Sequence, residues 1–140
     1  MDDMQVPQPQ PGQIKQSGAG KKILCIEDEH FISELYVRAL TKAGYEVKVI
    51  IDGETGLAEA LTNVYDIILL DIMIPNLTGI EVLKRLREQL PDLKAKVIIT
   101  TNLEQSEEGR GAIEKQADAY IVKAEITPSQ LVVFLEQIET

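Results

Sequence analysis

The sequence predicts an α/β fold, a doubly wound sheet of five parallel strands with helices on both faces. Five short runs rich in β-branched residues are almost continuously apolar, which is typical of strands buried on both faces. The segments between them repeat apolar residues three and four positions apart, the period of an amphipathic helix. Right-handed crossovers then place the carboxyl ends of all strands at one edge. The predicted strands are 23–26, 47–51, 67–70, 97–99 and 120–122.

Start and stop signals define four of the five predicted helices. Gly44 ends the first of them, because glycine readily takes the left-handed conformation that follows a helix. Asp52 is a suitable cap for the second helix. Thr78 and Glu81 fit a capping box for the third, and residues 127–130 fit another for the fifth, with proline at its first helical position.

The fourth predicted helix, over residues 103–116, is the weakest element. It contains Gly109 and Gly111, and each glycine costs about 1 kcal/mol relative to alanine in a helix interior. We therefore expect this helix to have low stability and to suit a switching role.

Composition bounds the class of protein. The chain has 140 residues, 44% of them hydrophobic, which suits one domain with its own core. The net charge of -9 disfavours direct binding to nucleic acid or to an anionic membrane. No apolar run approaches a membrane span and no signal peptide is visible, so we expect a cytoplasmic location. Cys25 and His30 are the sole residues of their types, which excludes a disulfide framework and a histidine-rich metal site.

The chain divides into a leader and one domain. Residues 1–20 are rich in glutamine and proline and hold too little apolar surface to repay ordering, so we interpret them as a disordered leader. Residues 21–140 form the predicted domain.

Charged side chains follow three of the predicted strands. Glu27 and Asp28 follow the first, Asp71 follows the third, and Lys123 follows the fifth. Because these strand ends share one edge, the carboxylates should crowd together and require a cation. An all-oxygen ligand set with few carboxylates favours hydrated Mg²⁺. An ordinary salt bridge between Asp71 and Lys123 explains the spacing equally well.

Four motifs in this order together resemble the receiver domain of response regulators in two-component signalling. They are residues 23–28, 71–79, 97–101 and 120–123, and the resemblance covers residues 21–140. The spacings agree, since Thr101 follows Asp71 by 30 residues and precedes Lys123 by 22. The resemblance implies a flavodoxin-like (βα)5 sandwich that acts as a phosphoacceptor module.

The resemblance implies a role for each acidic residue. Asp71 resembles the phosphoacceptor, which takes the phosphoryl group from a phosphohistidine of a histidine kinase or histidine phosphotransferase. Asp28 and Asp71 would bind Mg²⁺, or Mn²⁺ as a substitute, directly, and Glu27 would act through water. The backbone carbonyl of Met73 would be a further ligand.

The resemblance also implies a switch. Thr101 resembles the hydroxyl that binds the phosphoryl group, Lys123 the cation that pairs with it, and Tyr120 the aromatic side chain that turns inward on activation. Two alternatives stay open: Thr100 in place of Thr101, and Tyr120 as an ordinary half-buried strand residue. We expect Glu29 to be a solvent-facing charge at a helix start.

Some positions depart from the family pattern. Ala124 replaces the usual proline after Lys123, and a cis bond there would cost about 2.5–4 kcal/mol, so we expect a trans bond. Asn102 stands where a small residue is usual, and Gln116 where glycine is usual. These changes bear on the geometry of switching more than on phosphorylation itself.

The sequence favours a signalling module over an enzyme. We expect a stand-alone single-domain receiver that is no turnover enzyme, docks its unidentified target through the fourth helix, fifth strand and fifth helix, and can form a homodimer. The alternative is a receiver-like interaction module that works without phosphorylation. A phosphohydrolase of the haloacid dehalogenase type is disfavoured because Met73 stands where its general acid would be. A flavodoxin-like cofactor binder is disfavoured because residues 27–29 would repel phosphate.

Overall fold

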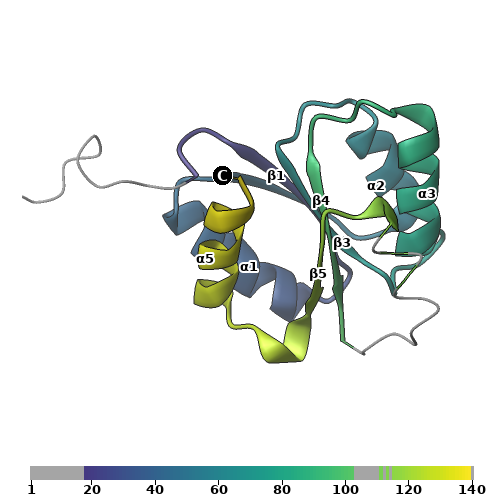
Figure 1. Cartoon of the computed structure of the whole chain (residues 1–140). Coiled ribbons are helices and arrows are strands. Elements are labelled where there is room, and N and C mark those ends of the chain that lie inside the picture. Colours follow the sequence, from purple (N-terminus) through teal and green to yellow (C-terminus); the bar gives the residue numbers. More distant parts are fainter. Residues whose placement is uncertain (1–17, 103–110, 112, 114, 140) are drawn as a thin grey trace, which may run out of the picture.

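The structure is a computed structural model that describes residues 18–102, 111, 113 and 115–139. Five parallel strands form one sheet in the order β2-β1-β3-β4-β5 (Figure 1). This arrangement confirms the predicted doubly wound sheet. The strands are β1 (Lys22–Ile26), β2 (Glu46–Ile50), β3 (Ile67–Asp71), β4 (Lys96–Thr101) and β5 (Ala119–Val122).

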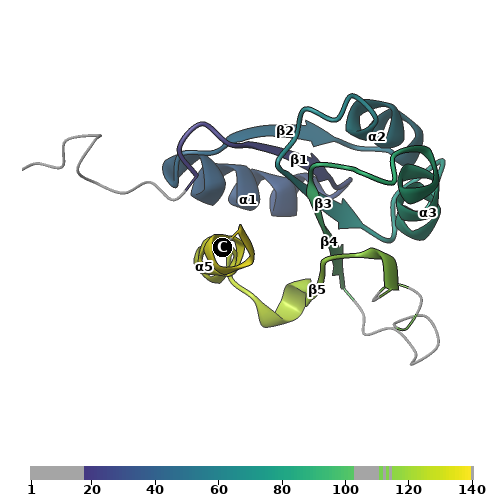
Figure 2. The same ribbon diagram turned by 45° about the horizontal axis from the view of Figure 1, so that its top comes forward.

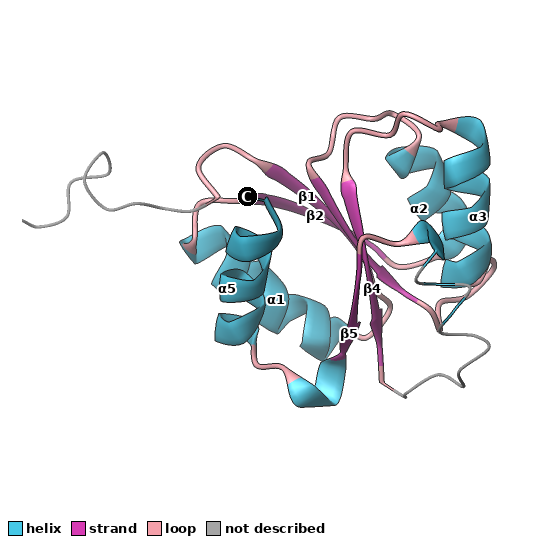
Figure 3. Ribbon diagram, viewed as in Figure 1, coloured by secondary structure: helices cyan, strands magenta, loops and turns pink. Residues whose placement is uncertain are grey.

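Helices cover both faces of the sheet. Figures 2 and 3 show α1 and α5 on one face and α2 and α3 on the other. The helices are α1 (His30–Lys42), α2 (Gly53–Ala60), α3 (Gly79–Gln89) and α5 (Pro128–Glu139), and a short 3-10 helix, η1 (Lys123–Glu125), follows β5. The fourth predicted helix lies mostly outside the described residues, of which 111, 113, 115 and 116 are helical. Within the described part of the chain, no helix combines the length and apolarity needed to cross a membrane.

The core has one layer on each side of the sheet. Alternate residues of β3 point to opposite layers, so Ile68 and Leu70 pack under α2 and α3, whereas Ile67 and Leu69 pack under α1 and α5. All five residues of β3 are buried, which is the burial expected of a central parallel strand. The polar side chain of Asp71 at its end is therefore a costly exception that requires partners.

The predicted helix signals are confirmed. The Thr78 side chain accepts a hydrogen bond from the Glu81 backbone N–H (3.2 Å). In the second box, Thr127 Oγ1 accepts from the Gln130 backbone N–H (3.1 Å), and Gln130 Oε1 accepts from the Thr127 backbone N–H (2.8 Å). Gly44 has φ of 103°, a left-handed conformation that ends α1. These local signals fix where each chain segment enters and leaves its helix.

Two glycines let the β3–α3 loop pack closely against its neighbours. A Cβ on Gly79 would lie 2.2 Å from the carbonyl oxygen of Asp71, and one on Gly53 would lie 1.9 Å from that of Leu77. The Gly53 N–H also donates to the Pro75 carbonyl oxygen (3.0 Å). The loop after β3 is therefore held between the starts of α2 and α3, which fixes the backbone around Asp71.

The start of β5 is tied to α3 and to β4. Arg87 on α3 donates from Nε to the Gln116 carbonyl oxygen (2.7 Å) and from Nη2 to Asp118 Oδ2 (3.2 Å). The same Asp118 oxygen accepts from the Val97 backbone N–H (2.7 Å). These bonds fix the start of the strand that leads to Lys123.

The folded part of the chain includes the last residues assigned to the leader. Gly18 is buried against the ring of Tyr45, and its N–H donates to the Ala43 carbonyl oxygen (2.9 Å). Residues 18–20 form a turn on the α1–β2 connection. The folded domain therefore includes Gly18.

Candidate functional site

The carboxyl edge of the sheet brings the predicted acidic residues together. One side-chain oxygen from each of Glu27, Asp28 and Asp71 lies within 4.8 Å of the others. Glu27 and Asp71 are each 2% exposed and Lys123 is 6% exposed, whereas Asp28 is open to solvent. The edge therefore holds a buried charged cluster with one exposed carboxylate at its rim.

Lys123 lies at the centre of this cluster and contacts three carboxylates. Its Nζ lies 2.5 Å from Glu27 Oε1, 3.1 Å from Asp71 Oδ2 and 3.5 Å from Glu29 Oε1. The contact with Glu27 is a short ion pair, and Lys123 donates a hydrogen bond to Asp71. The predicted salt bridge between Lys123 and Asp71 is thus present, as part of a larger network.

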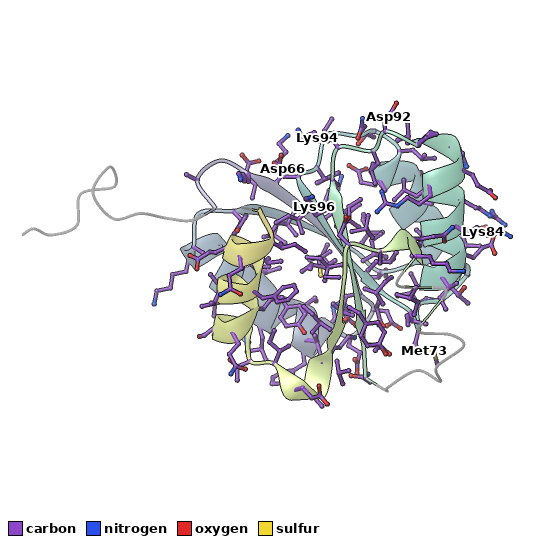
Figure 4. All side chains as sticks on the ribbon, viewed as in Figure 1. Asp66, Met73, Lys84, Asp92, Lys94 and Lys96 are labelled. Carbon is purple, nitrogen blue, oxygen red and sulfur yellow. The ribbon has the colours of Figure 1, made fainter. Side chains whose placement is uncertain are left out.

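Loop amides hold the other oxygen of each buried carboxylate. Asp71 Oδ1 accepts from the Met73 backbone N–H (3.2 Å), and Glu27 Oε2 accepts from the Glu29 backbone N–H (3.1 Å). Each carboxylate thus has one oxygen toward Lys123 and one toward the backbone. This arrangement orients both carboxylates, and it uses only the backbone of Met73, whose exposed side chain lies at the periphery in Figure 4.

The side chains of this cluster carry more negative than positive charge. The pKa of Glu27 is raised to about 7, because burial and the charge of Asp71 outweigh the opposite effect of Lys123. Burial alone would lower the pKa of Lys123, but its contacts with Glu27 and Asp71 outweigh burial and raise it. Among the described residues, one ammonium group thus contacts the carboxylates of Glu27, Glu29 and Asp71, and Asp28 adds a further carboxylate to the cluster.

The donor set fits a hard divalent cation. The clustered side chains offer carboxylate oxygens, the donors that Mg²⁺ prefers, and the exposed Asp28 leaves one side open to water. A divalent cation would also compensate the excess negative charge around Lys123. The cluster therefore meets the requirements of a hydrated Mg²⁺ site.

Two threonines lie beside Asp71. The Cα of Asp71 is paired with Thr100 on β4, and Thr101 is paired with Val122 on β5, directly before Lys123. Both threonines are buried, with exposed fractions of 2% and 1%. Both threonines thus lie at the carboxyl end of β4, and the choice between them stays open.

Tyr120 is half-buried on β5. Its side chain packs against the core layer under α2 and α3 and also lines a groove of about 550 Å³ on β5 and α5. The structure therefore supports its reading as a half-buried strand aromatic, and its inward turn stays a prediction.

The prediction for Glu29 is wrong in one respect. Its side chain is 49% exposed, but Oε1 lies near Lys123 and accepts a hydrogen bond from Asn102 Nδ2 (3.2 Å). Glu29 therefore belongs to the charged cluster instead of simply facing solvent. The helix-start position alone gives no sign of these contacts, because Asn102 and Lys123 are distant in sequence.

The peptide bond after Lys123 is trans, as expected for a non-proline residue such as Ala124. The chain turns there into η1, and the Ile126 N–H donates to the Lys123 carbonyl oxygen (3.4 Å). Lys123 thus lies in a defined turn without the proline that is usual at position 124.

Comparisons with known proteins agree with this site. The family model of the response regulator receiver domain matches residues 23–136. The transcriptional regulatory protein DltR of Streptococcus agalactiae serotype III is 39% identical over 102 residues, 73% of this chain and 45% of its own length. The chain therefore spans about half the length of the curated relatives it matches.

Solved structures give the same result. A CheY-like receiver domain protein from Methanospirillum hungatei superposes with a TM-score of 0.75 at 28% identity, over 86% of this chain and 95% of that one. The chemotaxis protein CheY4 of Vibrio cholerae superposes with a TM-score of 0.75 at 30% identity, over 86% and 99%.

The fold and the acidic edge thus define an α/β signalling domain. The chain belongs to the response regulator receiver domain family, whose members are phosphoacceptor modules of two-component signalling.

Proposed function

We propose that Asp71 is the phosphoacceptor of this receiver and that a phosphohistidine on a histidine kinase or phosphotransferase is the donor. An Asp71 carboxylate oxygen attacks phosphorus, the P–N bond to imidazole breaks, and the imidazole leaves with the electron pair. The observation that carries this proposal is the buried Asp71 carboxylate, oriented by Lys123 on one oxygen and by the Met73 N–H on the other.

Protein groups near Asp71 can stabilise the transferred group. Lys123 supplies a fixed positive charge, and the Thr101 hydroxyl, with Thr100 as the alternative, can donate a hydrogen bond to a phosphoryl oxygen. These donors are buried, so their interaction with a phosphoryl oxygen is less screened than it would be in water. Their burial also limits the access of water to the acyl phosphate.

Asp28 and Asp71 would hold Mg²⁺ or Mn²⁺ directly, and the Met73 carbonyl is the proposed backbone ligand. Glu27 is already engaged by Lys123 and the Glu29 N–H, which supports a contact through water. The cation, when bound, supplies positive charge that neutralises phosphoryl oxygens.

We propose that the domain acts as a switch and not as a turnover enzyme. Among the described residues around Asp71, the groups that hold its carboxylate are the Lys123 ammonium and the Met73 N–H, and neither can take a proton from an attacking water. A long-lived phosphorylated form is the expected consequence. Its half-life, followed after removal of the phosphodonor, measures this property.

We propose that a target protein docks on the groove of β5 and α5. Apolar side chains line much of it, including Ile126, Phe134 and the 52%-exposed Val133, and Tyr120 lies along its wall. A hydrophobic segment of a target would bury these groups, and a second copy of the chain is the alternative occupant. Sedimentation before and after phosphorylation, with a Val133→Asp variant, separates the two.

The stand-alone arrangement stays a prediction. The curated relative DltR is a transcriptional regulatory protein and the chain covers 45% of its length. The mass of the protein expressed from its own gene tests this prediction directly. A mass close to that of the 140 residues would support the stand-alone arrangement, and a protein about twice as long would contradict it.

Intact mass spectrometry tests phosphorylation. The chain is incubated with acetyl phosphate, with and without Mg²⁺, beside Asp71→Asn and the matched control Asp66→Asn. We expect one phosphoryl group on the wild type and on Asp66→Asn, with Mg²⁺ only, and none on Asp71→Asn. Absence of labelling under every condition would favour the phosphorylation-independent interaction module.

A further inference from the structure

Glu29 and Asn102 form a bridge across the edge of the sheet. Glu29 precedes α1 on the β1 side, and Asn102 directly follows β4. In the sheet order, β3 lies between β1 and β4, and Asp71 is its last residue. The hydrogen bond from Asn102 Nδ2 to Glu29 Oε1 (3.2 Å) therefore joins the strand ends on either side of Asp71.

The same Glu29 oxygen competes for Lys123. Oε1 lies 3.5 Å from Lys123 Nζ, the group that also contacts Asp71. A phosphoryl group carries between one and two negative charges and would require the same ammonium group. Two anions on one cation repel each other, so Glu29 beside Lys123 disfavours the arrival of a phosphoryl group at Asp71.

Glu29 is the carboxylate best able to leave. The side chains of Glu27 and Asp71 are 2% and 3% exposed and are held by a loop N–H, whereas the side chain of Glu29 is 49% exposed. Rotation of Glu29 into water breaks one exposed hydrogen bond, to Asn102, and one long ionic contact. Such contacts at a solvent-exposed position are weak.

We propose that Glu29, held by Asn102, is an anionic gate that selects against small anionic phosphodonors. The inference rests on the proposed role of Asp71. With acetyl phosphate, an Asp71 oxygen forms the new P–O bond while the P–O bond to acetate breaks and acetate leaves with the electron pair. Glu29 slows this step by occupying Lys123 and repelling the incoming anion, and a protein donor overcomes the gate through its docking contacts.

Rates of phosphorylation by acetyl phosphate in Mg²⁺ test the gate on the full chain. Glu29→Gln removes the charge but keeps an oxygen for Asn102, and we expect its rate to rise about tenfold. Asn102→Ala releases Glu29 without removing its charge, and we expect about a twofold rise. Glu34→Gln, at an exposed position of α1, changes the net charge equally and should leave the rate unchanged.

Salt separates an electrostatic gate from a structural effect. The ratio of the Glu29→Gln rate to the wild-type rate should fall toward one as ionic strength rises, because salt screens exposed charges. A ratio independent of salt would overturn the gate, as would equal rates for wild type, Glu29→Gln and Glu34→Gln.

The experiments distinguish failure of the proposed Glu29 gate from failure of Asp71 as the phosphoacceptor. If all these chains are phosphorylated on Asp71 at equal rates, the gate is overturned and the acceptor stands. If neither wild type nor Glu29→Gln is phosphorylated, both proposals are overturned. Urea unfolding of each variant verifies that the fold is intact, and Asn102→Ala decides the matter if Glu29→Gln does not fold.

Discussion

At each end of the sheet, an aspartate contacts a lysine and accepts a hydrogen bond from a backbone N–H, but the two pairs differ in burial. At the carboxyl edge, Asp71 accepts from a loop N–H through Oδ1 and from Lys123 through Oδ2. At the other end, Asp66 accepts from the Lys22 N–H (2.8 Å) through Oδ2 and contacts Lys94 (3.5 Å) through Oδ1. Figure 4 shows Asp66 and Lys94 at the opposite end of the molecule from Met73.

Burial and crowding distinguish the two pairs. The side chains of Lys123 and Asp71 are 2% and 3% exposed, whereas those of Lys94 and Asp66 are 53% and 29% exposed. Two further carboxylates, Glu27 and Glu29, also lie against Lys123. The bonding pattern alone therefore does not distinguish the candidate site from the other end of the sheet, whereas burial of the pair and the excess of negative charge do.

Removal of each lysine gives the largest expected contrast. Lys123→Met leaves Glu27 and Asp71 buried without their cation and should lower the free energy of unfolding by about 3 kcal/mol. Lys94→Met removes an exposed partner and should cost less than about 1 kcal/mol. Urea unfolding at neutral pH measures both, and equal losses would contradict the distinction between the two ends.

Backbone packing around Asp71 should be the next most sensitive feature. Gly79→Ala places a Cβ 2.2 Å from the Asp71 carbonyl oxygen, and the resulting shift should cost about 2 kcal/mol. At Gly111 a Cβ meets nothing within 4 Å, so Gly111→Ala should be neutral or stabilise by up to about 1 kcal/mol. Thermal unfolding measures both variants. A Gly79→Ala protein as stable as the wild type would show that the loop adjusts freely.

Magnesium should stabilise the fold by binding at the carboxyl edge of the sheet and not at the end where Asp66 lies. At ten times its dissociation constant, Mg²⁺ adds about 1.4 kcal/mol to the free energy of unfolding. Asp28→Asn should remove this gain, because Asp28 is the exposed carboxylate of the cluster, and Asp66→Asn should keep it. Melting temperatures with and without Mg²⁺ measure the effect. Equal gains in the two variants would place the cation elsewhere.

The smallest effect concerns Tyr65, next to Asp66. Burial and a hydrogen bond donated to Glu59 Oε2 (2.5 Å) raise the pKa of Tyr65 to about 12, above its ordinary value of 10. The neutral phenol is therefore favoured in the folded state, and its contribution is complete below pH 10 and is lost as pH rises toward 12.

Tyr65→Phe should consequently cost about 1 kcal/mol at pH 8. The difference from wild type should shrink between pH 10 and 12, and unfolding curves across that range measure it. A difference that is constant or grows in this window would contradict the raised pKa.

Local signals in the sequence predict much of this fold. Apolar runs identify all five strands, and the caps at Asp52, Thr78 and Thr127 form the predicted hydrogen bonds. The structure extends β1, β2 and β4 to include Lys22, Glu46 and Lys96, because backbone pairing continues beyond the apolar core. Strand prediction from apolar runs depends on the side chains and therefore misses these charged strand ends.

The sequence predicts those parts of the candidate site whose positions depend on chain topology alone. Parallel strands bring Glu27, Asp71 and Lys123 to one edge whatever the details of packing. The contacts of Glu29 with Asn102 and the close approach at Gly79 depend on loop paths and side-chain reach between distant segments. Such non-local geometry leaves no periodic signal in the sequence.

The central claim is that the buried carboxylate at the end of β3 accepts the phosphoryl group. Phosphorylation in Mg²⁺, followed by borohydride reduction, converts an aspartyl phosphate to homoserine, and mass spectrometry of the peptides locates it. We predict homoserine at position 71 alone. Homoserine at Asp28 or Asp66, or a phosphorylated chain with no change at position 71, would contradict the account.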